Sequence, residues 1–338
     1  MKPNNFSFYV SKFLSEYLPG IAGFSSNTIF AYRDMFKGLL CFYEDILSIR
    51  PERITIRDFN SENIACYLSW LTKTRGNSTS TRNNRLAAIH AFAKYVARRE
   101  PEYLHNMQEI ISIQMKQCRV SVPIFLSVDA MEYLLSLPDT SCRSGRRDCV
   151  LLSLLYDSGA RVQELCDLVV KDIRLESPPT IRLTGKGAKT RIVPLMPPMA
   201  ELLHCYIEEH GLTSLELSQH PLFINHCGKK FGRKGISYVL SKYFEAAKSI
   251  RPELYPYTIS PHSLRHSKSM HLLQAGVNLI YIRDILGHAD VKTTEIYARI
   301  DSEMKRKALE KATVGVVSGT LPIWQADSDL REWLNSLR

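Results

Sequence analysis

Residues 260–297 read SPHSLRHSKSMHLLQAGVNLIYIRDILGHADVKTTEIY, and the rest of the chain serves to position this stretch. The pair Ser260-Pro261 predicts a helix start, because Ser can accept hydrogen bonds from free backbone N–H groups and Pro fits the first turn. His262 and Arg265 then lie one helical turn apart on the same face. Both are near a helix N-terminus, where unpaired N–H groups and the helix dipole favour an anion such as phosphate.

Two more helices are predicted in the same stretch. The first helix ends at Gly276, a residue suited to a left-handed turn, and Asn278 can cap a second helix over 279–286. A glycine ends that helix as well, so His288 follows a chain reversal and is presented rather than packed. A short last helix carries Tyr297, nine residues after His288.

These residue types indicate phosphate chemistry when they occur together. Arginine donates two parallel hydrogen bonds to phosphate oxygens, imidazole moves protons, and a phenol oxygen can be a nucleophile. A single histidine or tyrosine on a helix is more often a packed or solvated residue. The combination is what favours a functional interpretation.

The three motifs resemble those of a known family. His262-Ser-Leu-Arg265, Leu286-Gly-His288 and Thr294-Glu-Ile-Tyr297 are similar in type, order and spacing to the motifs of the tyrosine recombinases, also called the phage integrase family. Further upstream, Arg161 follows the Gly turn 158–159 and resembles the family's first arginine. Glu164, one turn on, could orient its neighbours, or the two could form an ordinary surface ion pair.

A predicted β-hairpin supplies the remaining catalytic position. Strand-like runs at 180–184 and 190–194 bracket Gly185-Lys-Gly-Ala-Lys189, which places Lys186 at the tip. It matches the Gly-Lys-Gly hairpin of the recombinases, whose lysine reaches the cleaved phosphodiester. Lys189 and Arg191 are candidates for contacts to DNA phosphates, and solvation of the turn is the alternative.

The resemblance implies a role for each matched residue. Two arginines grip the non-bridging oxygens with a histidine as a further donor, a tyrosine attacks, a second histidine accepts its proton, and a lysine protonates the leaving 5′ oxygen. In that order the residues are Arg161, Arg265, His288, Tyr297, His262 and Lys186. The implied product is a 3′-phosphotyrosyl linkage, with no cofactor and no metal. His220, His226 and Cys227 lack a fourth ligand at a usual spacing, so no metal site is predicted.

The fold class expected is mainly α with a small β-sheet (α+β). Helices are predicted over 6–17, 26–46 with Ser26 as cap, 61–74 and 81–98. The resemblance implies a two-domain, C-shaped DNA clamp, with a helical SAM-like core-binding domain at 1–117 and a catalytic domain at 126–315. The linker is placed at 118–125, and an amphipathic tail at 316–338 packs in cis or on a neighbouring subunit.

The fourth predicted helix begins with small hydroxyl and basic residues that could meet a phosphate backbone. Arg82, Asn83 and Arg85 are the candidate DNA contacts, and a capped, solvated helix end is the alternative. The net charge of +10, from 44 basic and 34 acidic residues, is compatible with a polyanionic partner.

Composition narrows the class of protein further. The 338 residues, 45% of them hydrophobic, suffice for two cored domains, and no apolar run approaches the length of a membrane span. Eight scattered Cys without a Cys-x-x-Cys pair indicate neither a disulfide framework nor a zinc ribbon. The polar start is no signal peptide. We expect a cytoplasmic, nucleoid-associated protein.

The function expected from the resemblance is a site-specific recombinase or integrase of a mobile element. Its partners would be double-stranded DNA with inverted-repeat core sites, further copies of the chain forming a tetramer in the synapse, and accessory recombinases or DNA-bending proteins. The alternatives are a type IB topoisomerase or telomere resolvase, or a DNA-binding accessory factor without catalysis.

Overall fold

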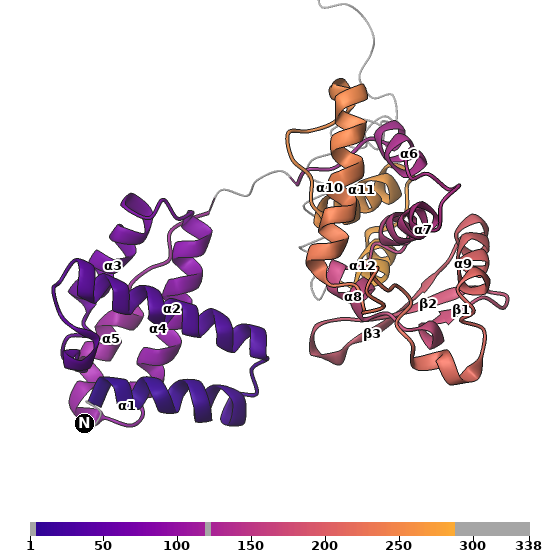
Figure 1. The fold of residues 1–338 in the computed structure, drawn as a ribbon. Coiled ribbons are helices and arrows are strands. Elements are labelled where there is room, and N and C mark those ends of the chain that lie inside the picture. Colours follow the sequence, from indigo (N-terminus) through magenta and orange to yellow (C-terminus); the bar gives the residue numbers. More distant parts are fainter. Residues whose placement is uncertain (1–4, 119–122, 288–338) are drawn as a thin grey trace, which may run out of the picture. The chain divides into compact units, whose positions relative to one another are not determined.

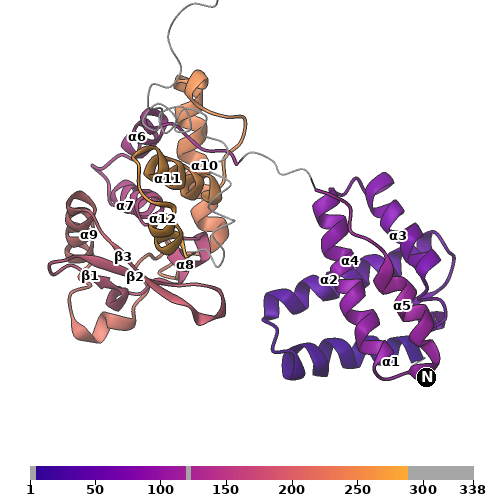
Figure 2. The same cartoon turned by 180° about the vertical axis from the view of Figure 1, so that it is seen from behind.

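The structure is a computed structural model, and it describes residues 5–118 and 123–287 (Figures 1 and 2). The chain divides into two compact units, Met1–Ser121 and Val122–Arg338. Helices predominate and a single three-stranded sheet is present among the described residues, so the predicted α+β class is confirmed. No helix within 5–118 and 123–287 is long and apolar enough to cross a membrane.

The first unit is helical throughout its described part. Its α-helices are α1 (Asn5–Lys12), α2 (Ser26–Asp45), α3 (Ser61–Lys73), α4 (Thr79–Ala97) and α5 (Leu104–Ser112). Aromatic rings fill the core between them: the ring centroid of Phe92 on α4 lies 5.3 Å from that of Phe13 and 5.0 Å from that of Phe36. These contacts between α2, α4 and the start of the chain give the unit a core of its own.

Two helix ends in this unit differ from the expected ones. The first helix does not end at Tyr17 but continues after α1 as a π-helix, Phe13–Ile21, which contains Pro19. Wider i to i+5 bonding, such as the donation from Ala22 N to Tyr17 O at 2.8 Å, fits a segment in which a proline lacks its N–H. Ser26 lies inside α2 rather than capping it.

The second unit packs seven helices and a small sheet in its described part. The helices are α6 (Val128–Ser136), α7 (Arg143–Asp157), α8 (Val162–Asp167), α9 (Pro197–Glu209), α10 (Arg233–Ile250), α11 (Pro261–Gln274) and α12 (Leu279–Leu286). The strands β1 (Ile173–Arg174), β2 (Thr180–Thr184) and β3 (Thr190–Pro194) form an antiparallel sheet in chain order. Figures 1 and 2 show this sheet at one end of the unit, beside α8, α9 and α12.

Helix α7 runs through the middle of this unit and packs against both α9 and α11. The leucines of α7 are almost completely buried, because they recur on the faces that meet these neighbours. The chain enters the unit on α11: Leu126 N donates to Ser267 Oγ at 2.8 Å, and Leu126 O lies 2.9 Å from His271 Nε2. The start of the unit is thereby fixed to the helix that carries His262 and Arg265.

Candidate active site

Arg161 and Glu164 lie at the N-terminus of α8, where the chain leaves α7. Gly159 adopts a positive φ of +56°, which allows the tight turn between the two helices. Arg161 is the residue before α8; its backbone N donates to Glu164 Oε2 at 2.8 Å and its Nη1 donates to Oε1 at 2.7 Å. The Glu164 side chain is only 3% exposed, so this is not the surface ion pair that the spacing also allowed.

Glu164 stays ionised because two arginines surround it. Burial alone would raise the pKa of its carboxyl group, but hydrogen bonds from Arg191 and Arg161 and the charge of Arg191 outweigh burial and lower the pKa to about 2. A buried carboxylate with this pKa carries its charge at every physiological pH. It therefore fixes the guanidinium of Arg161, as its position in the sequence suggested.

Arg191 differs from the expectation that it contacts DNA or solvates a turn. Its side chain, on β3, is 11% exposed, and it points inward at Glu164. Nη1 donates to Glu164 Oε1 at 2.9 Å, Nη2 to Oε2 at 2.7 Å, and Nε to the carbonyl oxygen of Ile285 at 2.7 Å. A guanidinium held in this way joins β3 to α8 and to α12 inside the unit. It does not face outward, as a phosphate ligand on the surface would.

Arg265 is placed by α11, about one turn after the helix begins at Pro261. The whole residue is 4% exposed, yet its donors meet backbone oxygens: Nη1 donates to Gly159 O at 2.6 Å and Nη2 to Leu286 O. The contact with Gly159 brings it beside Arg161, which follows two residues later. Arg161 is the more open of the two, with a side chain that is 35% exposed.

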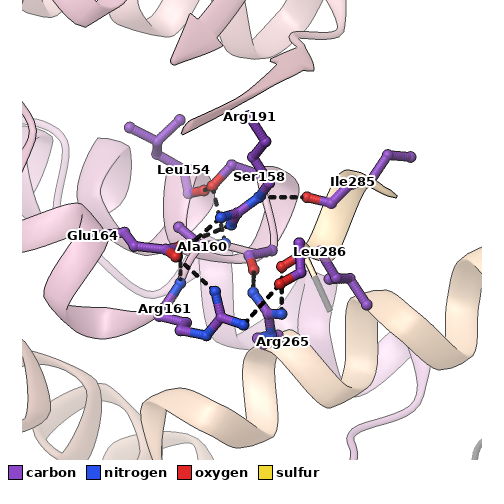
Figure 3. A network of polar contacts seen from close by, with 11 residues as sticks. Leu154, Ser158, Ala160, Arg161, Glu164, Arg191, Arg265, Ile285 and Leu286 are labelled. Atoms are coloured by element: carbon purple, nitrogen blue, oxygen red, sulfur yellow. Dashed lines mark hydrogen bonds and ion pairs between the residues drawn. The ribbon is translucent and has the colours of Figure 1, made fainter. Parts of the chain in front are cut away.

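Three consecutive carbonyl groups at the end of α12 each accept a hydrogen bond from a different arginine (Figure 3). The acceptors are the oxygens of Ile285, Leu286 and Gly287, and the donors in that order are Arg191, Arg265 and Arg161. Carbonyl groups at a helix C-terminus lack partners within the helix and carry its negative dipole end. They are therefore suited to orient cations, and here they hold both predicted phosphate-binding arginines.

His262 lies in the first turn of α11, one turn before Arg265, and its side chain remains exposed. Partial desolvation by the surrounding protein lowers the pKa of its imidazole, and the positive charges of Arg265 and Arg161 lower it further. The neutral ring is the form that can accept a proton. Because both arginines act on this ring, the three predicted residues gather in one place although their helices are far apart in the sequence.

The hairpin that was predicted between the two strand-like runs is present with the predicted strands. Thr184 lies opposite Thr190, and Gly185 N donates to Lys189 O at 2.8 Å. Lys186 is the first residue of the hairpin tip, and its side chain lies outside the described part of the structure. Lys189, at the other end of the tip, is exposed. A Cβ atom on Gly185 would lie 2.8 Å from Glu164 Oε1, so the base of the hairpin packs directly on the arginine cluster.

The three DNA-binding candidates of the first unit all have internal partners. Arg82 is buried and donates to Gln114 O at 3.2 Å, while Asn83 Nδ2 donates to Lys116 O at 2.7 Å. Arg85 Nη1 donates to Ala31 O at 2.9 Å, which joins α4 to α2. The first two tie the segment that leads to the linker onto α4. Their contact with DNA stays a prediction, and Arg85, which is half-exposed, remains the most accessible of the arginines there.

Two predicted catalytic residues, His288 and Tyr297, lie outside the described residues, as does the tail at 316–338. Within 5–118 and 123–287, no group of three or more His, Cys, Asp or Glu could hold a metal ion. The sequence alone did not predict that Arg191 contacts Glu164 and the end of α12. The one available indication was the glycine at position 185, whose lack of a side chain permits the close contact with Glu164.

Comparisons with known proteins identify the family of this chain. The model of the phage integrase family matches residues 125–304. The putative integrase/recombinase y4rC of Sinorhizobium fredii is 34% identical over 313 residues, 93% of this chain and 92% of that protein. Tyrosine recombinase XerC of Thermodesulfovibrio yellowstonii is 31% identical over 304 residues, 88% of this chain and 93% of that protein. In fold, the Tn1549 transposon integrase in complex with transposon right end DNA is similar with a TM-score of 0.68, at 17% identity over 90% of this chain and 98% of that chain.

Proposed function

The chain belongs to the phage integrase family and is a tyrosine-type site-specific DNA recombinase; on this premise we propose how its own residues cleave and rejoin DNA. Arg161 and Arg265 bind the non-bridging oxygens of the scissile phosphate. These oxygens gain charge as the attacking group approaches, so donors fixed in advance stabilise the transition state more than the ground state. His288, which directly follows the carbonyl group bound by Arg161, donates a further hydrogen bond.

Tyr297 is the proposed nucleophile. Its phenol, with an ordinary pKa of about 10, must lose a proton as it attacks phosphorus, and the neutral ring of His262 accepts that proton. The P–O bond to the 5′ oxygen breaks, and Lys186 at the hairpin tip protonates this leaving oxygen. The new 3′-phosphotyrosyl bond keeps the energy of the phosphodiester, so attack by another 5′-hydroxyl rejoins the strands without ATP.

One observation carries this proposal: Arg161 and Arg265 both donate to carbonyl groups at the end of α12, immediately before His288, and the charges of both act on the ring of His262. Positive charges brought together from distant parts of the chain repel one another, and a bound anion would offset this repulsion. Here a single carboxylate, Glu164, is shared by two arginines.

The decisive experiment is to trap the covalent intermediate. Binding sites are first selected from random duplex DNA, and a nicked duplex is then built in which the cleaved end diffuses away and the adduct accumulates. Wild type should form a protein–DNA adduct that resists denaturation, and Tyr297→Phe should form none while it binds the same duplex with similar affinity. An adduct with Tyr297→Phe would refute the assignment. Tyr281→Phe, an exposed tyrosine on α12, serves as the matched control.

We further propose the assembly in which this reaction occurs. Both units bind double-stranded DNA with inverted-repeat core sites: residues 1–117 as the core-binding domain and 126–315 as the catalytic domain, joined by the linker at 118–125. Exchange between two duplexes requires four strand cleavages and hence four tyrosines, which favours a tetramer. Arg85 and Lys189 are the proposed backbone contacts that the structure leaves accessible. The setting is the cytoplasm, on the DNA of a mobile element, with accessory DNA-bending proteins as further partners.

A further inference from the structure

The arginine cluster consists of Arg161, Arg191 and Arg265. Arg191 is the one of these three residues that takes no part in the proposed mechanism. We propose that Arg191 is a positioning residue: it balances the charge of Glu164 and fixes the end of α12, so that Arg161 keeps its orientation and its positive charge for the scissile phosphate. This inference rests on the proposed function, because it assigns Arg161 to that phosphate.

The contacts of Arg191 join three elements. From β3, its guanidinium reaches Glu164 on α8 with two hydrogen bonds of 2.9 and 2.7 Å, and the carbonyl oxygen of Ile285 on α12 with one of 2.7 Å (Figure 3). Arg161 uses the same two acceptors, Glu164 and the end of α12, through Gly287 O at 3.0 Å. The two arginines are therefore held by one carboxylate and one helix end, and displacement of Arg191 releases both supports of Arg161.

Charge gives a second reason. A buried carboxylate paired with Arg161 alone would cancel the charge of Arg161, and the site would attract a phosphate mainly through Arg265. With Arg191 on the opposite side of Glu164, the carboxylate is shared, and the cluster of two arginines and one glutamate keeps a net positive charge. Each Glu164 oxygen accepts from both residues, so neither arginine is neutralised by itself.

Backbone packing fixes the guanidinium in this place. A Cβ atom on Gly287 would lie 2.9 Å from Arg191 Cδ and 3.1 Å from its Nη1, and one on Gly185 would lie 2.8 Å from Glu164 Oε1. The two glycines let the ends of the hairpin and of α12 close over the ion pair. At 11% exposure the Arg191 side chain has no path to the surface without opening this contact.

The variants separate charge from geometry. Arg191→Met removes both the positive charge and the hydrogen bonds of the guanidinium. Arg191→Lys keeps the charge but cannot make the planar, forked contact. Glu164→Gln/Arg191→Met removes the buried pair together, which restores the charge balance around Arg161. Arg182→Met is the matched control, because Arg182 lies on the neighbouring strand β2 and pairs with Asp172 outside the cluster. All are made in the full chain, and each is measured in single turnover on the nicked duplex at saturating protein.

The rate of adduct formation should fall by about 10- to 100-fold in Arg191→Met, less than the about 100- to 1,000-fold expected when a transition-state donor is removed outright, and DNA affinity should fall by about tenfold at most. Arg191→Lys should lose less, and Arg182→Met should react as wild type does. The double variant should react faster than Arg191→Met although it carries one more substitution. A residue that merely held the fold together would give the opposite order, with the double variant the slowest. A wild-type rate for Arg191→Met, or no gain in the double variant, overturns the proposal.

A binding measurement decides the point without catalysis. In the Tyr297→Phe background, a duplex whose scissile phosphate is replaced by a neutral methylphosphonate should bind about tenfold more weakly than the phosphate duplex, and Arg191→Met should shrink this difference. If the difference in affinity between the two duplexes were unchanged in Arg191→Met, the charge argument would be wrong. If Arg191→Met does not fold, the same difference in affinity can be measured on Arg191→Lys and on the double variant. Failure of the proposed function looks different, because wild type itself would then form no adduct.

Discussion

At the scale of single residues, the carboxylate of Glu164 is the group on which the site depends most. Its four hydrogen bonds come from Arg161 and Arg191, and it is almost fully buried. Removing one partner of a buried ion cluster leaves the others uncompensated, which is far more costly than removing a surface pair.

We therefore predict that Glu164→Ala strongly destabilises the second unit. The buried guanidinium of Arg191 and the partly exposed one of Arg161 would face each other without their shared anion, and the free energy of unfolding should fall by about 3–5 kcal/mol, measured by urea denaturation. Glu209→Ala is the control, since Glu209 pairs with Arg146 at the surface and its loss should have little effect. Equal stability of the two variants would contradict the role given to Glu164.

The pH dependence of stability follows from the same groups. The pKa of Glu164 is lowered from 4.5 to about 2, so the unfolded chain binds more protons below pH 4.5 and this stabilisation is lost as the pH falls from there towards 2. The pKa values of His262, His266 and His271 are lowered from 6.5, mainly by burial. For these too the unfolded state takes up protons first, and stability declines as the pH falls below 6.5.

We thus predict two acid steps, one below pH 6.5 from the histidines and one below pH 4.5 from Glu164. The midpoint of urea unfolding, followed from pH 8 to 3, should fall through both ranges, and Glu164→Gln should remove the lower step. A midpoint that rises on acidification would be incompatible with the lowered pKa values. The cleavage rate should persist below pH 6.5 and decline only where His262 is protonated.

The sequence alone predicted some of the residues that form the site and missed others. His262 and Arg265 belong to a local motif, so one turn of helix was enough to place them on one face. The internal contacts of Arg191 could not be predicted, because its partners, Glu164 and Ile285, are 27 and 94 residues away in the chain. No local pattern tells an arginine that faces a phosphate from one that faces a buried carboxylate across a fold.

At the scale of elements, the end of α12 organises the site through its backbone. Gly287 is the left-handed residue after the helix, with φ +64°, and its N–H donates back to Asp284 O at 3.2 Å. This conformation exposes the last carbonyl groups of the helix to the three arginines. A side chain at position 287 would both strain the turn and push Arg191 away.

We predict that Gly287→Ala lowers the free energy of unfolding more than a glycine-to-alanine change at a turn with the same backbone conformation but no neighbouring atoms. Gly211 is the matched control: its φ of +63° is nearly identical, but no atom lies within 4 Å of a Cβ placed there. Gly211→Ala should lose about 1 kcal/mol for the backbone conformation alone. Gly287→Ala should lose more and should also slow adduct formation. Equal losses in urea unfolding, with unchanged cleavage, would show that the contact with Arg191 is unimportant.

The prediction of elements was best where local turn chemistry is strong. The hairpin strands and α12 have the predicted bounds, because glycines and an Asn cap mark their ends. Helix α9 was not predicted: its start at Pro197-Pro198 looks like a loop, although proline is compatible with a first helical turn and Met199, Leu203 and Tyr206 are buried at helical spacing. The π-helical extension of α1 had no recognisable pattern, since it depends on aromatic packing around Phe13.

At the scale of the whole molecule, the two units have separate hydrophobic cores. Among the described residues, the fully buried part of the first core ends at Ile110, and that of the second begins at Leu126. Every described residue of the candidate active site comes from the second unit. The DNA contacts proposed for the first unit stay a prediction, and of its five described α-helices the sequence did not predict α5.

This separation leads to a prediction about DNA affinity. If both units grip the same duplex, joining them makes the second binding event intramolecular, and the full chain should bind about 100- to 10,000-fold more tightly than the better single unit. The eight residues at 118–125 span at most about 29 Å, short enough to keep the effective concentration high. Residues 1–121 and 122–338, expressed separately and mixed, supply the same surfaces without the link. Affinities are compared at a fixed salt concentration, because phosphate contacts weaken steeply with salt. If the mixed units matched the full chain, binding would come from one unit alone, and the proposal that both units hold one DNA would have to be abandoned.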